Sequence, residues 1–282
     1  MNLKKINLIK QRAWNSTRFP FDTINKSLKH VPTLLSVEEK KMLNWICRQY
    51  VTGAGQVCDL GSFLGGSTIQ LANGLKHNGS IQKLDVKVHS YDRFMIDENI
   101  VEKWIVPNKL TVTANGDTLK TVQKMLKDYS NVIYNQGDFL EQIWINKPIE
   151  ILFIDIAKTW ALSDHIVKQF FTHLIPNHSI VVQQDMLFVN CPWICAVMFA
   201  LRDHFEFLSA TEKYSALFLC TKEIKPFHLE YALHKNFEAQ EILQSIDFFI
   251  HKMNYYPHIE VLRELKRRVK ENPTITKSWE LK

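Results

Sequence analysis

The sequence has 282 residues, of which 46% are hydrophobic and 23% are charged. These values are typical of a globular protein with a full core, and they exclude an intrinsically disordered chain. The net charge of +6 is mild and permits an anionic substrate. The basic residues do not form dense clusters interleaved with aromatic ones, so we expect no nucleic-acid partner.

The cysteines and the apolar runs indicate the compartment. Five cysteines are scattered along the chain without a strong zinc-site spacing, which favours reduced and buried thiols. No apolar run approaches the roughly 18 residues that a membrane-spanning helix needs. The first ten residues mix apolar side chains with lysines, unlike a signal peptide. We therefore expect a cytoplasmic protein without a transmembrane segment.

Residues 1–35 are basic and aromatic, and we interpret them as an irregular arm that covers the domain or a neighbouring subunit. The first ten of them favour a helix exposed to solvent. The aromatic residues of the arm are Trp14, Phe19 and Phe21. A helix is predicted to start after Ser36, its N-cap, because Glu39 lies three residues further on as in a capping box.

The stretch 57–68 predicts a buried strand, a glycine turn and the start of a helix. Gly61 permits a turn that a Cβ atom would obstruct, and the Gly65–Gly66 pair is expected to let the backbone approach a ligand. Ser67 and Thr68 are expected to donate hydrogen bonds at the helix N-terminus, where free N–H groups point outward. This order of elements forms the nucleotide-binding corner of open α/β sheets.

Four further strands are predicted, and each ends in polar groups. They span residues 87–92, 131–138, 149–155 and 179–185. The acids at or near the carboxyl ends of the five strands are Asp59, Asp92, Asp138, Asp155 and Asp185. Ligands bind on that side of open sheets, so the acids predict a binding site along one edge.

The order of these elements predicts the fold class. Helices separate the strands, and residues 205–221 predict a hairpin that closes the sheet. We therefore expect an α/β fold, a Rossmann-like and mostly parallel sheet with an antiparallel edge strand and flanking helices. Residues 95–130 include an insertion near the substrate mouth.

The chain divides into an N-terminal arm (1–35), an α/β domain (36–223) and a helical C-terminal extension (224–282). The extension carries a basic cluster at residues 263–270. We interpret this cluster as a solvated face, with contact to an anionic carrier or a membrane as the alternative.

The spacing Asp59-x-Gly61-x-x-x-Gly65-x-Ser67 resembles the first motif of class I S-adenosylmethionine (SAM)-dependent methyltransferases. The Gly-Gly-Ser-Thr sequence within it resembles the branch of macrolide-sugar O-methyltransferases and of proteins linked to surface-polysaccharide synthesis. The resemblance covers about residues 30–222. It implies that residues 36–223 form a SAM-binding methyltransferase domain, that the acceptor is a sugar, a glycan precursor or another small hydroxylated molecule, and that the protein forms a homodimer.

The resemblance also implies how SAM is held. Its amino-acid end would lie over the Gly61–Gly66 turn, its ribose would bind Asp92, and its adenine would lie beside Asp138. The implied cofactor-binding residues are Asp59, Gly61, Ser62, Gly65, Ser67, Thr68, Asp92, Arg93, Gly137, Asp138 and Asp155.

The sequence Asp155-x-x-Lys158 resembles the metal-dependent O-methyltransferases of the catechol and caffeoyl-CoA kind. Carried over, the resemblance implies that Asp155, Gln184 and Asp185 hold Mg²⁺ and that Lys158 is the general base. Gln184 and Asp185 depart from the Asp-Asn pair of that group, which puts the metal in doubt. Lys158 would need a pKa below its ordinary value of about 10.4, towards which burial and a nearby cation would both act. His165 is the rival base.

Two other functions remain open. A nicotinamide-dependent oxidoreductase is disfavoured because the sequence lacks the G-x-G-x-x-G fingerprint and an evident Tyr-x-x-x-Lys pair. A SAM-binding module without catalytic activity is compatible with Gln184 and with the unexplained extension.

Overall fold

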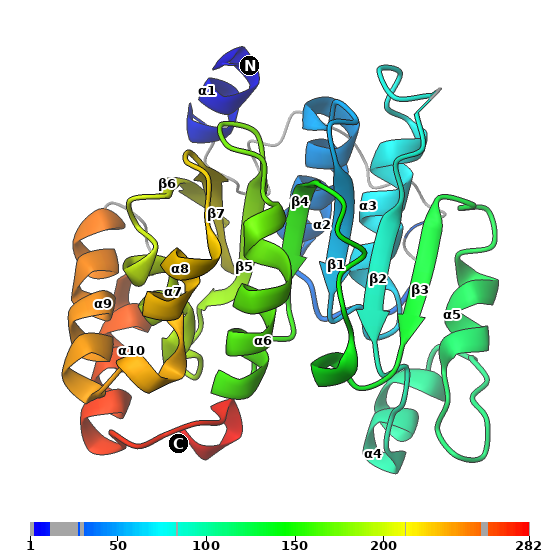
Figure 1. Ribbon diagram of the computed structural model, residues 1–282. Helices are drawn as coiled ribbons and strands as arrows, with labels where there is room; N and C mark the ends of the chain where they lie inside the picture. Colours follow the sequence, from blue (N-terminus) through cyan, green and yellow to red (C-terminus); the bar gives the residue numbers. More distant parts are fainter. Residues whose placement is uncertain are drawn as a thin grey trace.

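The computed structural model describes residues 3–11, 28, 31–82, 84–211, 213–254 and 259–281. Its strands are β1 (Gln56–Leu60), β2 (Val88–Asp92), β3 (Val132–Gln136), β4 (Ile149–Ile154), β5 (Ile180–Leu187), β6 (Phe205–Ala210) and β7 (Tyr214–Cys220). Together they form a seven-stranded sheet with the order β3-β2-β1-β4-β5-β7-β6 (Figure 1).

The sheet is mostly parallel. Strands β1 to β5 pair in parallel, whereas β7 pairs antiparallel with both β5 and β6. Every residue of β4 and β5 is buried, as expected for central strands that helices cover on both faces. These findings confirm the predicted Rossmann-like sheet and its antiparallel hairpin at the edge.

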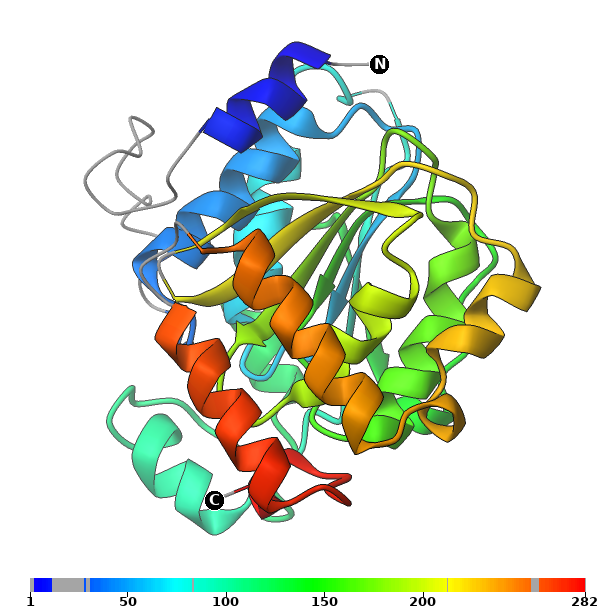
Figure 2. The same cartoon turned by 90° about the vertical axis from the view of Figure 1, so that its left-hand side faces the viewer.

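Helices cover both faces of the sheet, as the side view in Figure 2 shows. One face packs against α1 (Leu3–Gln11), α2 (Val37–Trp45) and α3 (Gly66–Lys76). The other face packs against α6 (Trp160–Phe170), α7 (Pro192–Ala200), α9 (Ala239–Lys252) and α10 (Ile259–Glu271). The described residues also form the short α-helices α4 (Glu98–Ile100), α5 (Leu119–Met125) and α8 (Pro226–Leu229).

The N-terminal segment differs in part from the expectation. Residues 3–11 form a packed helix, because Ile6 and Ile9 are buried against the sheet and Lys10 forms an ion pair with Glu206 at 2.6 Å. Neither an irregular arm nor a helix exposed to solvent describes these residues. The predicted contacts of Trp14, Phe19 and Phe21 lie outside the described residues.

The start of α2 confirms the predicted capping box. The Ser36 hydroxyl accepts a hydrogen bond from the Glu39 amide, and the Glu39 carboxylate accepts one from the Ser36 amide. The same carboxylate also accepts a bond from the Ser215 hydroxyl at 2.6 Å. Glu39 therefore caps the start of α2 and also joins this helix to β7.

The C-terminal extension is helical, as predicted, and it packs on the core. Apolar residues of α9 and α10, such as Ile246 and Leu265, are fully buried in the same hydrophobic cluster as α6 and α7. The basic residues at 263–268 form ion pairs with acids of the extension. These pairs neutralise much of the cluster, which disfavours the anionic-carrier alternative.

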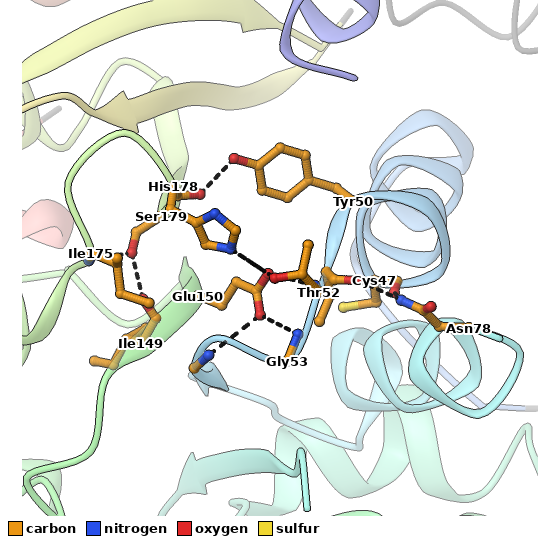
Figure 3. A network of polar contacts seen from close by, with 12 residues as sticks. Cys47, Tyr50, Thr52, Gly53, Asn78, Ile149, Glu150, Ile175, His178 and Ser179 are labelled. Carbon is orange, nitrogen blue, oxygen red and sulfur yellow. Dashed lines mark hydrogen bonds and ion pairs between the residues drawn. The ribbon is translucent and has the colours of Figure 1, made fainter. Parts of the chain in front are cut away.

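The amino-terminal edge of the sheet holds a polar network around Glu150, the second residue of β4 (Figure 3). Its fully buried carboxylate accepts hydrogen bonds from the amides of Thr52, Gly53 and Gly55 and from the Thr52 hydroxyl. His178 Nε2 lies 2.7 Å from the same carboxylate. Glu150 thus fixes the loop that enters β1.

The cysteines are buried and free, as the sequence predicted. Among the described helices, none combines the length and the apolar character needed to cross a bilayer.

Candidate functional site

The predicted acids lie at one edge of the sheet. Because β2, β1, β4 and β5 are neighbours and run in parallel, their carboxyl ends meet at this edge. In Figure 1, the arrowheads of β2 and β3 point towards the bottom of the picture, where α4 and the C-terminal end of the chain also lie.

Gly61 makes the turn that leaves β1. Its φ is +96°, and a Cβ atom there would lie 2.8 Å from the carbonyl oxygen of Asp155. Its amide donates a hydrogen bond to the Tyr91 carbonyl of β2. The next side chain, Ser62, is buried, and its Oγ has no partner among the described residues. This turn is therefore packed against the loop that carries Asp155, and its serine hydroxyl is buried without a partner among the described residues.

The neighbouring glycines serve the protein's own packing. A Cβ atom at Gly65, whose φ is +86°, would lie 2.9 Å from a methyl group of Val122, and one at Gly66 would lie 2.3 Å from Thr33. Val122 of α5 and Thr33 therefore occupy the space beside the α-carbons of the two glycines, and the approach of the backbone at both glycines to a ligand stays a prediction.

Asp59 is enclosed by the start of α3. Its Oδ2 accepts hydrogen bonds from Ser67 Oγ at 3.0 Å and from Thr68 Oγ1 at 2.5 Å. Its Oδ1 is buried without a partner in the described part of the chain. Burial raises the pKa of Asp59 to about 7, against the two hydroxyl bonds that lower it. The structure thus places Asp59, Ser67 and Thr68 inside the fold, where they join β1 to α3.

Asp92 lies at the end of β2 and organises two loops. Its Oδ2 accepts the Phe63 amide and its Oδ1 the Phe94 amide, both at 2.8 Å. Each oxygen keeps a second lone pair for a ligand. Burial raises the pKa of Asp92, against the two backbone bonds and the charge of the exposed Arg93. Asp92 is thereby held beside the Gly61 turn, and its binding of a ribose stays a prediction.

The carboxyl end of β3 lies next to Asp92. The amide of Gly137 donates a hydrogen bond to the Asp92 carbonyl at 3.1 Å. The Asp138 carboxylate caps the following 3₁₀ turn by accepting the Leu140 amide at 3.0 Å. The structure therefore brings Gly137 and Asp138 to the same edge as Asp92.

Lys158 lies between two carboxylates. Its Nζ donates to Asp155 Oδ1 at 2.9 Å and also to Asp185 Oδ2. Burial alone would lower the pKa of Lys158, but the charges of Asp155 and Asp185 outweigh it and raise the pKa above its ordinary value. The expectation of a lowered pKa is wrong, because the neighbours of this ammonium are anions.

The implied metal ligands do not form a metal site in this arrangement. Asp155 and Asp185 both bind the Lys158 ammonium, and Gln184 Oε1 is buried without a partner in the described structure. Among the described residues, no group of three or more His, Cys, Asp or Glu side chains could hold a metal ion. The residues present therefore do not fit a divalent cation while Lys158 stays in place.

His165 points to another loop. Its Nε2 donates to the Gln142 carbonyl at 2.8 Å, and its ring contacts Phe139. This nitrogen joins α6 to the loop after β3, and the role of His165 as a base stays a prediction.

The sequence did not predict that the C-terminal segment would reach this site. Trp160 donates its amide to the Thr276 carbonyl at 3.0 Å, and Ser278 donates its amide to the Lys158 carbonyl at 2.8 Å. Arg268 donates to Asn190 Oδ1, in the loop between β5 and α7. The extension thus holds both loops that flank the Lys158 bridge.

Glu39 is a second unexpected neighbour. It is fully buried, and burial raises its pKa, to which the nearby charge of Asp185 adds. Its charge also contributes to the raised pKa of Asp155, which burial brings to about 7 against the lowering effect of Lys158. Its capping role was readable from the sequence, whereas its approach to the acids depends on how α2 packs.

The sequence matches no protein-family model, and no curated protein matches it. Among solved structures, the O-methyltransferase NovP is 11% identical, with a TM-score of 0.47 over 65% of this chain and 78% of NovP. The O-methyltransferase TomG from Streptomyces achromogenes, involved in tomaymycin synthesis and solved with SAM, is 16% identical, with a TM-score of 0.43 over 79% of this chain and 100% of TomG.

An rRNA methylase from Streptococcus thermophilus is 12% identical, with a TM-score of 0.42 over 68% of this chain and 100% of that chain. Because the identities are 11–16% and the TM-scores are below 0.5, these similarities carry no argument about activity or acceptor.

Proposed function

We propose that this protein is a SAM-dependent methyltransferase that methylates a hydroxyl group of a small molecule. The observation that carries the proposal is the carboxyl edge of the sheet, where the Gly61 turn and Asp92 lie together. This is the place and the order of elements that the resemblance implies for SAM. The parallel strands followed by an antiparallel hairpin also agree with that fold.

Two polar groups at this edge support a bound nucleoside and amino acid. Asp92 has a free lone pair on each oxygen, which suits the two ribose hydroxyls. Ser62 Oγ lacks a partner among the described residues, at the turn where the amino-acid end of SAM would lie. A buried polar atom without a partner is costly, so a ligand that satisfies Ser62 would gain affinity.

The Lys158 bridge is the proposed acceptor site. SAM would supply the reactive methyl group through its sulfonium. Lys158 is the cation of the bridge, so it acts as a hydrogen-bond donor: two of its three N–H groups serve Asp155 and Asp185, and the third can bind an acceptor oxygen. The carboxylates beside it are the groups that can take the proton of the hydroxyl.

A SAM-binding module without catalytic activity is the second candidate. It is favoured by the engagement of Lys158 with two carboxylates, which leaves this residue without a lone pair for catalysis. Methyl transfer to any hydroxyl in a panel of sugars and phenols would exclude it. SAM binding without turnover on any of them would favour it.

Calorimetric titration of the full chain with SAM tests the proposal. We expect micromolar binding by the wild type and a loss of at least tenfold in Asp92→Asn, which keeps one acceptor oxygen for the backbone. Asp85→Ala, on an exposed residue just before β2, is the matched control and should bind as the wild type does. Failure of the folded wild type to bind SAM would contradict the proposal.

The finer parts of the proposal need separate tests. A sugar or glycan-precursor acceptor, a role in polysaccharide biosynthesis, a cytoplasmic location and a homodimer all follow from the interpretation of the sequence. Light scattering on the purified chain tests the dimer, and methyl transfer to nucleotide sugars compared with simple phenols tests the acceptor class.

A further inference from the structure

The Lys158 ammonium contacts two of the three residues to which the sequence resemblance assigns a divalent cation. It contacts Asp155, just after β4, and Asp185, within β5, two carboxylates that parallel strands bring together. The side chains of Lys158, Asp155 and Asp185 are 37%, 23% and 11% exposed, so the bridge is partly shielded from water. Solvent therefore screens its charges less than it screens an exposed surface ion pair.

The backbone around Lys158 holds the side chain in this place. The Lys158 carbonyl accepts the Ser278 amide, and the neighbouring Ala157 carbonyl accepts Trp193 Nε1 at 2.6 Å. The loop is thus attached to α7 on one side and to the C-terminal segment on the other. The ammonium reaches the two acids from an anchored position.

A divalent cation would compete with this ammonium for the same oxygens. Mg²⁺ requires near-octahedral coordination by oxygen atoms at about 2.0–2.1 Å. The protein offers the two carboxylates and the neutral Gln184, whereas a lysine that donates to both acids would lie within a few ångström of the ion. Two positive charges that close repel strongly in a partly buried site.

We propose that Lys158 is the resident cation of this site, and that it takes the place of a divalent metal in holding Asp155 and Asp185 together. The chain then binds no divalent cation there as long as Lys158 is present. Removal of the ammonium leaves two carboxylates facing each other, which creates an affinity for a hard cation that the wild type lacks. Lys158 is in this sense a positioning residue, whether or not the proposed methyl transfer takes place.

Titration of the full chain with Mn²⁺, followed by electron paramagnetic resonance, tests this inference without SAM or an acceptor. We expect no stoichiometric Mn²⁺ site in the wild type and one site per chain in Lys158→Met, with an affinity at least tenfold higher. The double variant Lys158→Met/Asp185→Asn should lose that site again. Lys270→Met, on the exposed side of α10, is the matched control and should behave as the wild type.

A second measurement covers the case in which Lys158→Met folds poorly. The melting temperature of the wild type should be the same in MgCl₂ and in EDTA, and that of Lys158→Met should rise when Mn²⁺ is added. A stoichiometric Mn²⁺ site in the wild type that Asp155→Asn abolishes would overturn the inference. So would a folded Lys158→Met that binds Mn²⁺ no better than the wild type. SAM titration is unaffected by either result, so failure of the inference and failure of the proposed function can be distinguished.

Discussion

Buried carboxylates at the amino-terminal and the carboxyl ends of the parallel strands have pKa values that are shifted in opposite directions. At the amino-terminal edge, both oxygens of Glu150 receive hydrogen bonds, and His178 adds a further contact (Figure 3). Burial would raise the pKa of Glu150, but the bonds from His178 and Thr52 outweigh it, and the pKa is lowered. At the carboxyl ends of the strands, burial outweighs the hydrogen bonds: it raises the pKa of Asp59 to about 7, and it also raises the pKa of Asp155.

This difference in hydrogen bonding indicates which carboxylates stabilise the fold and which can bind a ligand. A carboxylate that is fully satisfied holds loops together and gains nothing from a ligand. Perturbed acids that are incompletely satisfied gather at binding sites, because a substrate or cofactor completes them. Glu150 therefore has a structural role at the amino-terminal ends of the strands, and the proposed binding site lies at their carboxyl ends, around Asp92 and Lys158.

The largest expected effect comes from Glu150→Ala. It leaves the amides of Thr52, Gly53 and Gly55 without their acceptor, so we expect a loss of about 3–5 kcal/mol in the free energy of unfolding. Urea denaturation measures it. SAM affinity of the folded fraction should stay within twofold of the wild type. A loss below about 1 kcal/mol would show that the amino-terminal edge does not depend on this carboxylate.

Gly61→Ala should affect both stability and binding. A left-handed φ costs a non-glycine residue roughly 1–3 kcal/mol, and the new Cβ would press on the Asp155 carbonyl. We therefore expect a comparable loss of stability and a loss of SAM affinity of at least tenfold. Gly79→Ala, where a Cβ atom meets no atom within 4 Å, is the control and should change neither. Unchanged SAM binding by Gly61→Ala would separate the turn from the proposed cofactor site.

Asp59→Asn should change how stability depends on pH. Because the pKa of Asp59 is raised, its carboxyl group keeps its proton in the folded state between about pH 4 and pH 7, whereas it is ionised in the unfolded state. The contribution of Asp59 to stability therefore falls as pH rises through this window, by about 4 kcal/mol, because each pKa unit corresponds to about 1.4 kcal/mol.

The measurement is the free energy of unfolding at pH 5 and at pH 8, for the wild type and for Asp59→Asn. The wild type should lose more stability than the variant between these values. Equal losses would mean that Asp59 is ionised throughout, and the contrast between the two edges would then weaken.

The smallest expected effect is that of His178→Gln. It removes one of several partners of the Glu150 carboxylate, and a glutamine amide can replace part of the bond. We expect a loss of about 1 kcal/mol by urea denaturation. An effect as large as that of Glu150→Ala would mean that the imidazole, rather than the backbone amides, keeps the carboxylate ionised.

The fold was predictable because its signals are local. Apolar runs such as 149–154 identify central strands, and the capping box at Ser36 and Glu39 identifies the start of a helix. The acids at the strand ends were predictable because each follows a strand-like apolar run, and the carboxyl ends of parallel strands lie on the same side of a sheet. The direction in which Ser67 and Thr68 point depends on the rotation of α3 about its axis, which the local pattern does not set.

The chemistry of the site was less predictable because it depends on distant residues. The pKa of Lys158 is raised by an acid 27 residues away as well as by one three residues away. Glu39 and Asp185 approach each other only when α2 packs on the sheet. No periodicity in residues 272–281 indicates that they pair with the loop at 158–160.

The pairing of the C-terminal segment with the Lys158 loop has a consequence for biosynthesis. A ribosome adds about 5–20 residues per second, so residues 276–278 appear several seconds after residues 158–160. The parallel strands can form in that interval, but the loop that carries the lysine stays without its last two backbone bonds. We expect the loop that carries Lys158 to become ordered in a nascent chain only when the extension docks.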